Sequence, residues 1–314
     1  MKETFESGLI STSAASGGGL STLSSNDIPL LKEYLSSVPS WLSAYSLPAL
    51  IIWQDFLSYY WTLLDDHFCL FAQYDGNYYM PVPPLGDGFS EHAVRQSFFL
   101  MDHLNSNPAI SRIENVDEDS AALFRGIGLE VRLNSHEYLY RRQSLASLKG
   151  NAYKSKRWAI NYFIKHYQAS FEPYRSADLS QCIELFDDWR SMRQTKFKDS
   201  YYRALMEDSA LAHRQAMEHY QDLGLVGRVV KINGQVKGYT FGFKLRPQVF
   251  CVLLEVTDRQ IKGLAQFLFW KFCGELERYT YINALDDSGL ENLRKVKESY
   301  HPERLLQSLV VYRV

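Results

Sequence analysis

The sequence has few cysteines, and their spacing fits neither a metal site nor a disulfide framework. Four cysteines occur among 314 residues, and no two of them stand in C-x-x-C spacing. Three of them lie within apolar runs, as free buried thiols do. This pattern predicts a reducing compartment and no zinc site, and we expect no bound cofactor. The four residues are Cys69, Cys182, Cys251 and Cys273.

Long apolar runs are also lacking. The N-terminus carries Lys2 but no apolar stretch of the signal-peptide kind. The most apolar early segment, residues 47–53, is far shorter than the ~20 residues that a membrane-spanning helix needs. We therefore expect a cytoplasmic protein without a transmembrane segment, and peripheral contact with anionic lipid remains an open alternative.

An overall excess of basic charge is missing as well. The formal net charge is −2 at pH 7, so any contact with nucleic acid must come from a local basic patch. The hydrophobic content of 46% and the charged content of 22% are those of a soluble globular protein. The aromatic content of 14%, which includes 21 Tyr, fits a large ligand groove and equally a Tyr-rich core and surface.

The length of the chain suits two domains that follow a short tail. Residues 1–24 are rich in Ser, Gly and Thr, and we expect them to form a flexible tail because they bury little apolar surface. The remaining residues suffice for two domains, each large enough to bury a core. Ser25, Asn26 and Asp27 precede an apolar periodic segment and predict the start of a helix.

Two β-hairpins form the clearest regularity, one in each half of the chain. Asp75-Gly76-Asn77 and Asn233-Gly234 are turn sequences that join β-rich runs. Such turns are the strongest short-range signals for a hairpin. The halves therefore resemble two copies of one architecture. The predicted hairpin strands are residues 67–74 with 78–82, and residues 227–232 with 235–245.

The second half predicts the element order β-α-α-β-β-β-α-β-α-β. Apolar periodicity and turn signals define its helices and strands. The order restricts the fold more than any single motif does. The predicted elements are a strand at 169–174, helices at 179–189 and 202–222, the hairpin, a strand at 249–255, a helix at 263–277, a strand at 279–285, a helix at 288–300 and a strand at 305–314.

The segment from Val249 to Ala265 is a candidate site for an anionic ligand. A buried strand delivers Glu255, and a turn of the form Q-x-x-G-x-A leads into an apolar helix. Unpaired N–H groups and the helix dipole favour an anion at such a helix start. The alternative is an ordinary strand-to-helix turn. The candidate donor-binding residues are Gln260, Lys262, Gly263 and Ala265.

A second unusual stretch, residues 138–171, carries seven basic residues and no acidic residue. On a helix that begins at Lys154, a basic face lies apart from an aromatic one. Such a face suits a phosphate-rich partner: a tRNA acceptor stem, CoA or an anionic lipid headgroup. The alternative is a solvated helix face that confers solubility. The candidate phosphate or RNA patch consists of Lys149, Lys154, Lys156, Arg157 and Lys165.

The element order resembles that of the GNAT acyltransferases, the GCN5-related N-acetyltransferases. Gln260, Gly263 and Ala265 match their donor-binding pattern Q/R-x-x-G-x-G/A. Four further segments resemble the C-terminal domain of phosphatidylglycerol lysyltransferase. The likeness extends over most of residues 25–314. These segments are Leu148-Lys149-Gly150, residues 154–161 (KSKRWAIN), residues 282–294 (INALDDSGLENLR) and Ser299-Tyr300-His301-Pro302.

This resemblance implies an α/β (α+β) fold of two tandem GNAT-like domains, residues 25–145 and 146–314. In each domain a mixed central sheet is flanked by helices. The second domain would be the active one, because it contains the donor turn. Leu85-Gly86-Asp87-Gly88, in the first domain, is not expected to form such a turn.

The resemblance also implies catalytic roles for two residues. Glu255 would deprotonate the attacking group, and Tyr300 would protonate the leaving group. The structural alternatives are an ion pair for Glu255 and a core position for Tyr300. Asn283 and Asp286 would hold the acceptor, whereas Asp287 and Ser288 have the sequence of a helix cap.

The predicted function is transfer of an acyl or aminoacyl group to an amine or hydroxyl by direct attack. An aminoacyl-tRNA is slightly favoured over acyl-CoA as the donor, and either would be a co-substrate. The alternative is a non-catalytic GNAT-like module that binds tRNA or an anionic lipid surface. The sequence does not define the acceptor or the oligomeric state.

Overall fold

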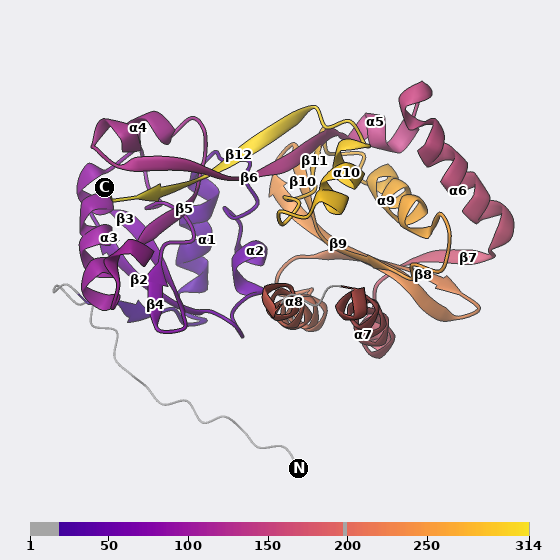
Figure 1. Ribbon diagram of the computed structural model, residues 1–314, viewed down its shortest axis with the longest axis horizontal. Helices are drawn as coiled ribbons and strands as arrows, with labels where there is room; N and C mark the ends of the chain where they lie inside the picture. The colour runs from indigo at the N-terminus through magenta and orange to yellow at the C-terminus, as the bar shows by residue number, and fades with distance from the viewer. Residues whose placement is uncertain (1–18, 197–199, 314) are drawn as a thin grey trace, which may run out of the picture.

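A mixed sheet of eight strands crosses the molecule and joins the two halves of the chain (Figure 1). The computed structural model describes residues 19–196 and 200–313. Neighbouring strands are antiparallel except β10 and β11, which are parallel. In spatial order the strands are β5 (Arg112–Val116), β12 (Arg304–Tyr312), β6 (Glu130–Arg141), β11 (Tyr281–Asn283), β10 (Val249–Thr257), β9 (Gln235–Arg246), β8 (Val226–Ile232) and β7 (Ala169–Pro173).

The C-terminal strand lies among strands of the N-terminal half. β12 pairs with β6 from Arg304 opposite Leu139 to Tyr312 opposite Glu130, and its other edge pairs with β5. β6 in turn pairs with β11. The predicted domain boundary after residue 145 falls within α5 (Arg142–Ser147). The two halves therefore share one sheet across that boundary.

A smaller sheet covers the N-terminal end of the molecule. It consists of β1 (Ser21–Thr22), β2 (Ser58–Leu64), β3 (His67–Tyr74) and β4 (Asn77–Tyr79). A parallel bridge between Met80 and Ile113 links it to the large sheet. Residues 21 and 22, which we predicted as part of the flexible tail, instead form a strand because their backbones pair with β2. Residues 1–18 of that tail lie outside the described residues.

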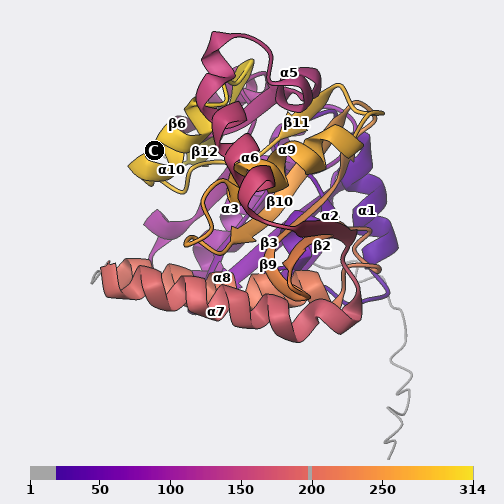
Figure 2. The same ribbon diagram turned by 90° about the vertical axis from the view of Figure 1, so that its right-hand side faces the viewer.

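Helices cover both faces of the large sheet in the C-terminal half (Figures 1 and 2). Tyr239, Phe241 and Phe243 of β9 pack in one core with residues of α7 and α8. Phe250 and Val252 of β10 point to the other face and pack with α9. This alternation follows from the two-residue period of a strand. The helices of this half are α6 (Lys154–His166), α7 (Leu179–Lys196), α8 (Ser200–Glu218), α9 (Leu264–Glu275) and α10 (Glu291–Glu298).

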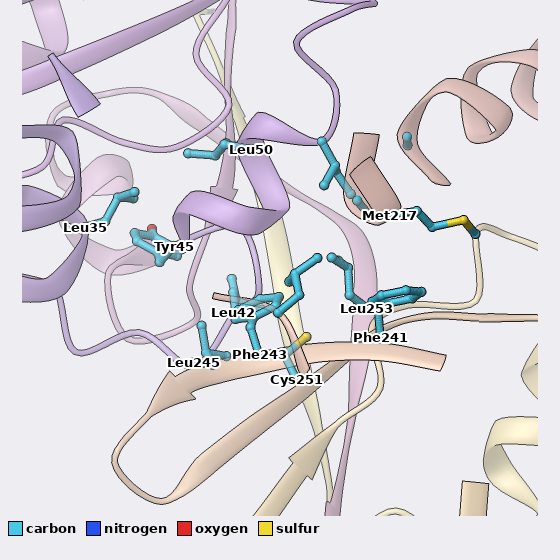
Figure 3. Packing of buried hydrophobic residues seen from close by; sticks show 14 of the residues in the cluster. Leu35, Leu42, Tyr45, Leu50, Met217, Phe241, Phe243, Leu245, Cys251 and Leu253 are labelled. Carbon is cyan, nitrogen blue, oxygen red and sulfur yellow. The ribbon is translucent and has the colours of Figure 1, made fainter. Parts of the chain in front are cut away.

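One hydrophobic core continues from the N-terminal helices into the C-terminal sheet. Figure 3 shows Leu42 of the N-terminal half beside Phe243 and Cys251, and Leu50 and Leu253 belong to the same core. All five side chains are buried. The halves are therefore packed together by apolar burial and by the shared sheet. The helices of the N-terminal half are α1 (Ile28–Ser37), α2 (Leu47–Ile51), α3 (Glu91–Leu104) and α4 (Ala121–Gly126).

The predicted element order of the second half is confirmed, and so are both hairpins. Asn233 and Gly234 have φ of +51° and +78°, as a tight hairpin turn requires. Two predicted elements are shorter in the structure: β11 ends at Asn283, and α10 begins only at Glu291. Positive φ at Leu285, Ser288 and Gly289 explains the difference, because neither a strand nor a right-handed helix accommodates it.

Candidate active site

Strands β10 and β11 diverge and open a wedge in the large sheet. They pair only from Val249 opposite Tyr281 to Cys251 opposite Asn283, yet β10 continues to Thr257. Beyond β11 the chain follows β6, where the Tyr138 N–H donates to the carbonyl of Leu285 at 3.1 Å. Among the described strands, none pairs with this edge of β10 beyond Cys251. Its N–H and C=O groups can therefore bind a ligand.

A β-bulge at Leu253 and the carboxylate of Glu255 lie on this free part of β10. The register shifts between Val252 and Leu254, and Glu255 then stands opposite Thr240 of β9. Within residues 19–196 and 200–313, Glu255 Oε2 and Thr240 Oγ1 are buried and make no hydrogen bond of ordinary geometry, although the Thr240 hydroxyl lies close enough to lower the pKa of the Glu255 carboxyl. Burial raises the pKa of Glu255 to about 8, against the opposing effect of the Lys297 charge. A carboxyl group in this state is suited to general-base catalysis near neutral pH.

Tyr300 is the second residue after α10 and lies close enough to Glu255 for the charge of Glu255 to affect it. Its ring packs edge-on against Phe269 at a centroid distance of 5.1 Å. Burial raises the pKa of Tyr300 well above its usual value, and the nearby charge of Glu255 raises it further. The structure thus brings together the two predicted catalytic residues. Tyr300 also belongs to the hydrophobic core around α9, so the site and the core coincide here.

Lys297 is a site residue that the sequence analysis missed. Its ammonium donates to the carbonyl of Ala284 and, at 3.3 Å, to that of Leu285. These two residues follow β11, at the point where the chain diverges from β10. Burial lowers the pKa of Lys297 to about 8, and the charge of Asp286 opposes the shift. A signal was present: Lys297 stands four residues after Leu293 and three before Tyr300, on the inward face of α10.

Lys156 belongs to this region and not to the predicted phosphate patch. It is buried, its ammonium donates to Ser299 Oγ at 2.6 Å, and it lies 4.0 Å from the centroid of the Tyr300 ring. Burial lowers its pKa. The reason is its place on the inner face of α6, which it shares with Ile160 and Phe163.

The two predicted acceptor residues have local roles. Asn283 is fully buried, and its amide donates to the carbonyl of Trp41 at 2.9 Å and to Glu137 Oε2 at 2.6 Å. Its Oδ1 accepts from the Leu285 N–H at 2.8 Å. Asn283 thus joins the two halves of the chain. Asp286 is partly exposed, and its Oδ1 accepts from the Ser288 N–H at 3.2 Å.

The predicted donor turn packs against helix α6. Gly263 has φ of +85°, and a Cβ at this position would collide with the carbonyl oxygen of Ala159. Glycine at this position therefore makes room for the backbone of α6, and not for the backbone of a ligand. Gln260 is exposed and lines a cleft of about 640 Å³ beside α7. Ala265, the second residue of α9, is partly exposed, and donor binding by this turn stays a prediction.

The basic patch is smaller than predicted. Lys149, Lys154 and Lys165 are exposed, as expected for phosphate contacts. Arg157 instead donates to the carbonyls of Leu148 and Gly150, the latter at 2.6 Å, and so closes the C-terminal end of α5. Its Nη1 is therefore bonded within the protein.

A separate cleft of about 590 Å³ opens in the N-terminal half. Trp41, Phe89 and Arg304 contribute to its wall. The loop with Gly86 and Gly88 also lines it, between β4 and α3. In the described part of the chain, no group of three or more His, Cys, Asp or Glu is arranged to hold a metal ion.

The family model of the C-terminal domain of phosphatidylglycerol lysyltransferase matches residues 36–312. The chain belongs to this family. The resemblance seen in the sequence is thereby confirmed. No curated protein matches the chain.

Solved structures share the fold at low sequence identity. A conserved protein of unknown function from Bacteroides thetaiotaomicron is 23% identical, with a TM-score of 0.81 over 93% of this chain and 98% of that chain. L-PGS from Bacillus licheniformis is 16% identical, with a TM-score of 0.63 over 91% of each chain. A tandem GNAT protein from the clavulanic acid biosynthesis pathway is 11% identical, with a TM-score of 0.51 over 93% of this chain and 97% of that chain. The predicted GNAT-like α/β fold is thereby confirmed. Among the described residues, no helix has the length and apolarity to cross a membrane.

Proposed function

We propose that this protein is an aminoacyltransferase of the GNAT type, which moves an aminoacyl group from a tRNA to a hydroxyl or amine acceptor. The observation that carries the proposal is the wedge between β10 and β11. It combines a free strand edge, a bulge and the buried carboxyl group of Glu255, whose pKa burial raises to about 8. The family of the chain supports the same class of reaction.

The reaction would proceed by direct attack in the wedge. Glu255 takes the proton of the acceptor's hydroxyl or amine while the oxygen or nitrogen of the acceptor bonds to the aminoacyl carbonyl carbon. The ester bond to the ribose oxygen of the tRNA then breaks. Tyr300 donates its proton to that oxygen, and its raised pKa keeps it protonated until then. A proton from the acceptor replaces the one that Tyr300 loses, so protons balance over the cycle.

Lys297 and the strand edge would stabilise the transition state. The ammonium of Lys297 donates to the carbonyls of Ala284 and Leu285, which follow β11, and its charge lowers the pKa of Glu255. A fixed cation and free N–H groups near the reacting carbonyl favour the oxyanion that forms during attack. Its contacts with two carbonyl oxygens offset part of the cost of burying this cation, and the lowered pKa of Lys297 reflects the part that remains.

The packing of α6 favours aminoacyl-tRNA over acyl-CoA as the donor. The pyrophosphate of CoA needs N–H groups and close backbone approach at the start of α9. At Gly263 that approach is taken by the carbonyl oxygen of Ala159, which is itself partly negative. A donor that enters by another path keeps access to Glu255 without displacing α6.

A transfer assay with two donors tests the proposal. The protein would be incubated with phosphatidylglycerol vesicles and either tRNA charged with radiolabelled lysine or radiolabelled acetyl-CoA. We expect labelled lipid from the charged tRNA, and none from Glu255→Gln. Label transferred from acetyl-CoA alone would overturn the choice of donor. Binding of charged tRNA without transfer to lipid or to added amines would show a binding module in place of an enzyme.

A further inference from the structure

Helix α6 carries a row of three aromatic rings on its outer face. Trp158, Tyr162 and His166 follow one another at intervals of four residues and so lie on one side of the helix. The ring centroids are 5.6 Å apart between Trp158 and Tyr162, and 4.0 Å apart between Tyr162 and His166. Trp158 is 55% exposed, which is unusual for so large an apolar side chain. We call these three residues the α6 ring row.

Three lysines surround the α6 ring row. The ammonium of Lys262 lies 4.5 Å from the Trp158 ring and 5.0 Å from the Tyr162 ring. Lys154 and Lys165 are exposed on the same side of α6. Residues 138–171 contain no Asp or Glu, so no acidic side chain of this stretch neutralises the surface.

The inner face of the same helix reaches the candidate active site. Lys156 contacts Ser299 and the ring of Tyr300, and Ala159 packs on Gly263 at the start of α9. Figure 2 shows α6 in front of α9, at the end of the molecule farthest from α3 in Figure 1. A chain bound along the outer face of α6 therefore passes close to the donor turn.

We propose that the α6 ring row and Lys154, Lys165 and Lys262 bind the single-stranded end of an RNA. Bases stack on the rings, and phosphates contact the lysines. This inference rests on the proposed function, because it assigns a docking surface to the tRNA donor. It adds a role for aromatic residues that no phosphate contact requires.

The composition of the surface favours RNA over a lipid bilayer. A helix that lies on a membrane needs a continuous apolar face. The exposed aliphatic residue of α6, Ile164, lies about 120° around the helix from Trp158. Ser155 and Asn161 flank the ring row on either side, each about 60° around the helix from Trp158, and both are exposed and polar. The surface is therefore aromatic and cationic without being continuously apolar.

Binding of a fluorescein-labelled RNA of eight nucleotides tests the inference, with fluorescence anisotropy at 50 mM and 200 mM salt. We expect the single strand to bind more tightly than a duplex of the same sequence. Trp158→Ala should weaken binding about tenfold, the effect of one lost stacked base, and Trp158→Phe should retain most of it. The matched control is Phe99→Ala, which removes an exposed ring that lies 4.0 Å from His103 on α3.

The lysines are tested through the salt dependence of the same binding. Each phosphate contact contributes about −0.7 to the slope of log K against log salt for a single strand. Replacing Lys154 and Lys165 together by Ala should therefore reduce the slope by about 1.4. The control is Lys271→Ala on α9, whose ammonium lies 5.4 Å from the ring of Trp270. Lys271→Ala removes one positive charge and one contact between a lysine and a ring, but it leaves the α6 ring row and its three lysines unchanged.

Three results would overturn the inference. The first is no loss of RNA binding in Trp158→Ala, and the second is an equal loss of RNA binding in Phe99→Ala. The third is that Trp158→Ala loses binding to phosphatidylglycerol vesicles and keeps its RNA binding. The last result would assign the surface to a membrane.

Failure of the proposed function is distinguishable from failure of this inference. If transfer from charged tRNA occurs and Trp158→Ala leaves its KM unchanged, the docking surface is wrong and the function stands. If the single strand binds as expected and no transfer occurs, the surface stands and the function is wrong.

Discussion

The carboxyl group of Glu255 and the phenol of Tyr300 lie near enough for the charge of the first to raise the pKa of the second. They come from β10 and from the second residue after α10, 45 positions apart in the sequence. The divergence of β10 and β11 makes this possible, because Tyr300 packs in the same core as Val252 of β10, which lies just beyond Cys251, the last residue of β10 that pairs with β11. The two residues that we propose as proton acceptor and proton donor thus lie at one wedge.

Replacing Glu255 by Gln should abolish most of the transfer activity and leave donor binding unchanged. The loss should be about 10² to 10⁴-fold in kcat, the usual contribution of a general base. In the wild type, kcat should rise with pH through about 8, because the base acts only when ionised and burial raises its pKa to about 8. Initial rates between pH 6 and 9 measure both effects. The control is Glu291→Gln, an exposed Glu paired with Lys295 at 2.6 Å. A pH profile that Glu255→Gln leaves unchanged would contradict a role as base.

The same carboxyl group should make stability depend on pH. Its pKa is raised in the folded state, so the folded protein holds a proton that the unfolded chain releases above about 4.3. The stabilising contribution is complete below that pH and is lost as the pH rises to about 8. The Tm of Glu255→Gln minus the Tm of the wild type should therefore increase as the pH rises from 5 to 8. A constant difference in Tm over this range would contradict the raised pKa.

Much of the fold followed from the sequence, but the pairing of distant strands did not. Turn residues such as Asn233-Gly234 act locally, so the hairpins were predictable. The position of β12 between β5 and β6 depends on contacts across almost 200 residues, and no local pattern carries it.

The candidate site shows the same division. Glu255 was identified because it follows a buried strand, and the turn after it matched a motif. Lys156 was placed on the phosphate patch and Lys297 was missed because a lysine was assumed to face solvent. Both ammonium groups instead find an oxygen inside the protein, the Ser299 hydroxyl for Lys156 and the Ala284 carbonyl for Lys297. Whether a long side chain finds a buried partner depends on the tertiary structure.

Replacing Lys156 by Met should leave RNA binding and its salt dependence unchanged, because the ammonium points to Tyr300 and away from the outer face of α6. The matched variant is Lys154→Met on the outer face, which should weaken binding and reduce the salt slope by about 0.7. Fluorescence anisotropy with the labelled single strand measures both. Equal effects of the two variants would place Lys156 on the phosphate patch after all.

Replacing Asn283 by Ala should destabilise the protein by about 2 to 4 kcal/mol, since it removes hydrogen bonds to a buried carboxyl group and to a loop of the other half. Glu137 would keep Ser43, which donates to it from N–H and hydroxyl at 2.9 Å and 2.6 Å. Urea unfolding gives the free energy. The control Asn292→Ala, at an exposed position of α10, should change it by less than about 0.5 kcal/mol. A similarly small change in Asn283→Ala would show that the amide does not hold the two halves together.

Gly263 and Gly289 separate backbone strain from packing at the donor turn. Both have positive φ, +85° and +68°, so Ala at either position costs about 1 to 2 kcal/mol of backbone strain. Around Gly289 nothing lies within 4 Å of the added Cβ, whereas at Gly263 it collides with the Ala159 carbonyl. Gly263→Ala should therefore lower the free energy of unfolding by at least about 1 kcal/mol more than Gly289→Ala, which urea unfolding resolves. It should also displace α6, and so weaken binding of the single-stranded RNA. Equal losses in the two variants would mean that α6 does not rest on the turn, and the turn would then be open to a phosphate of the donor.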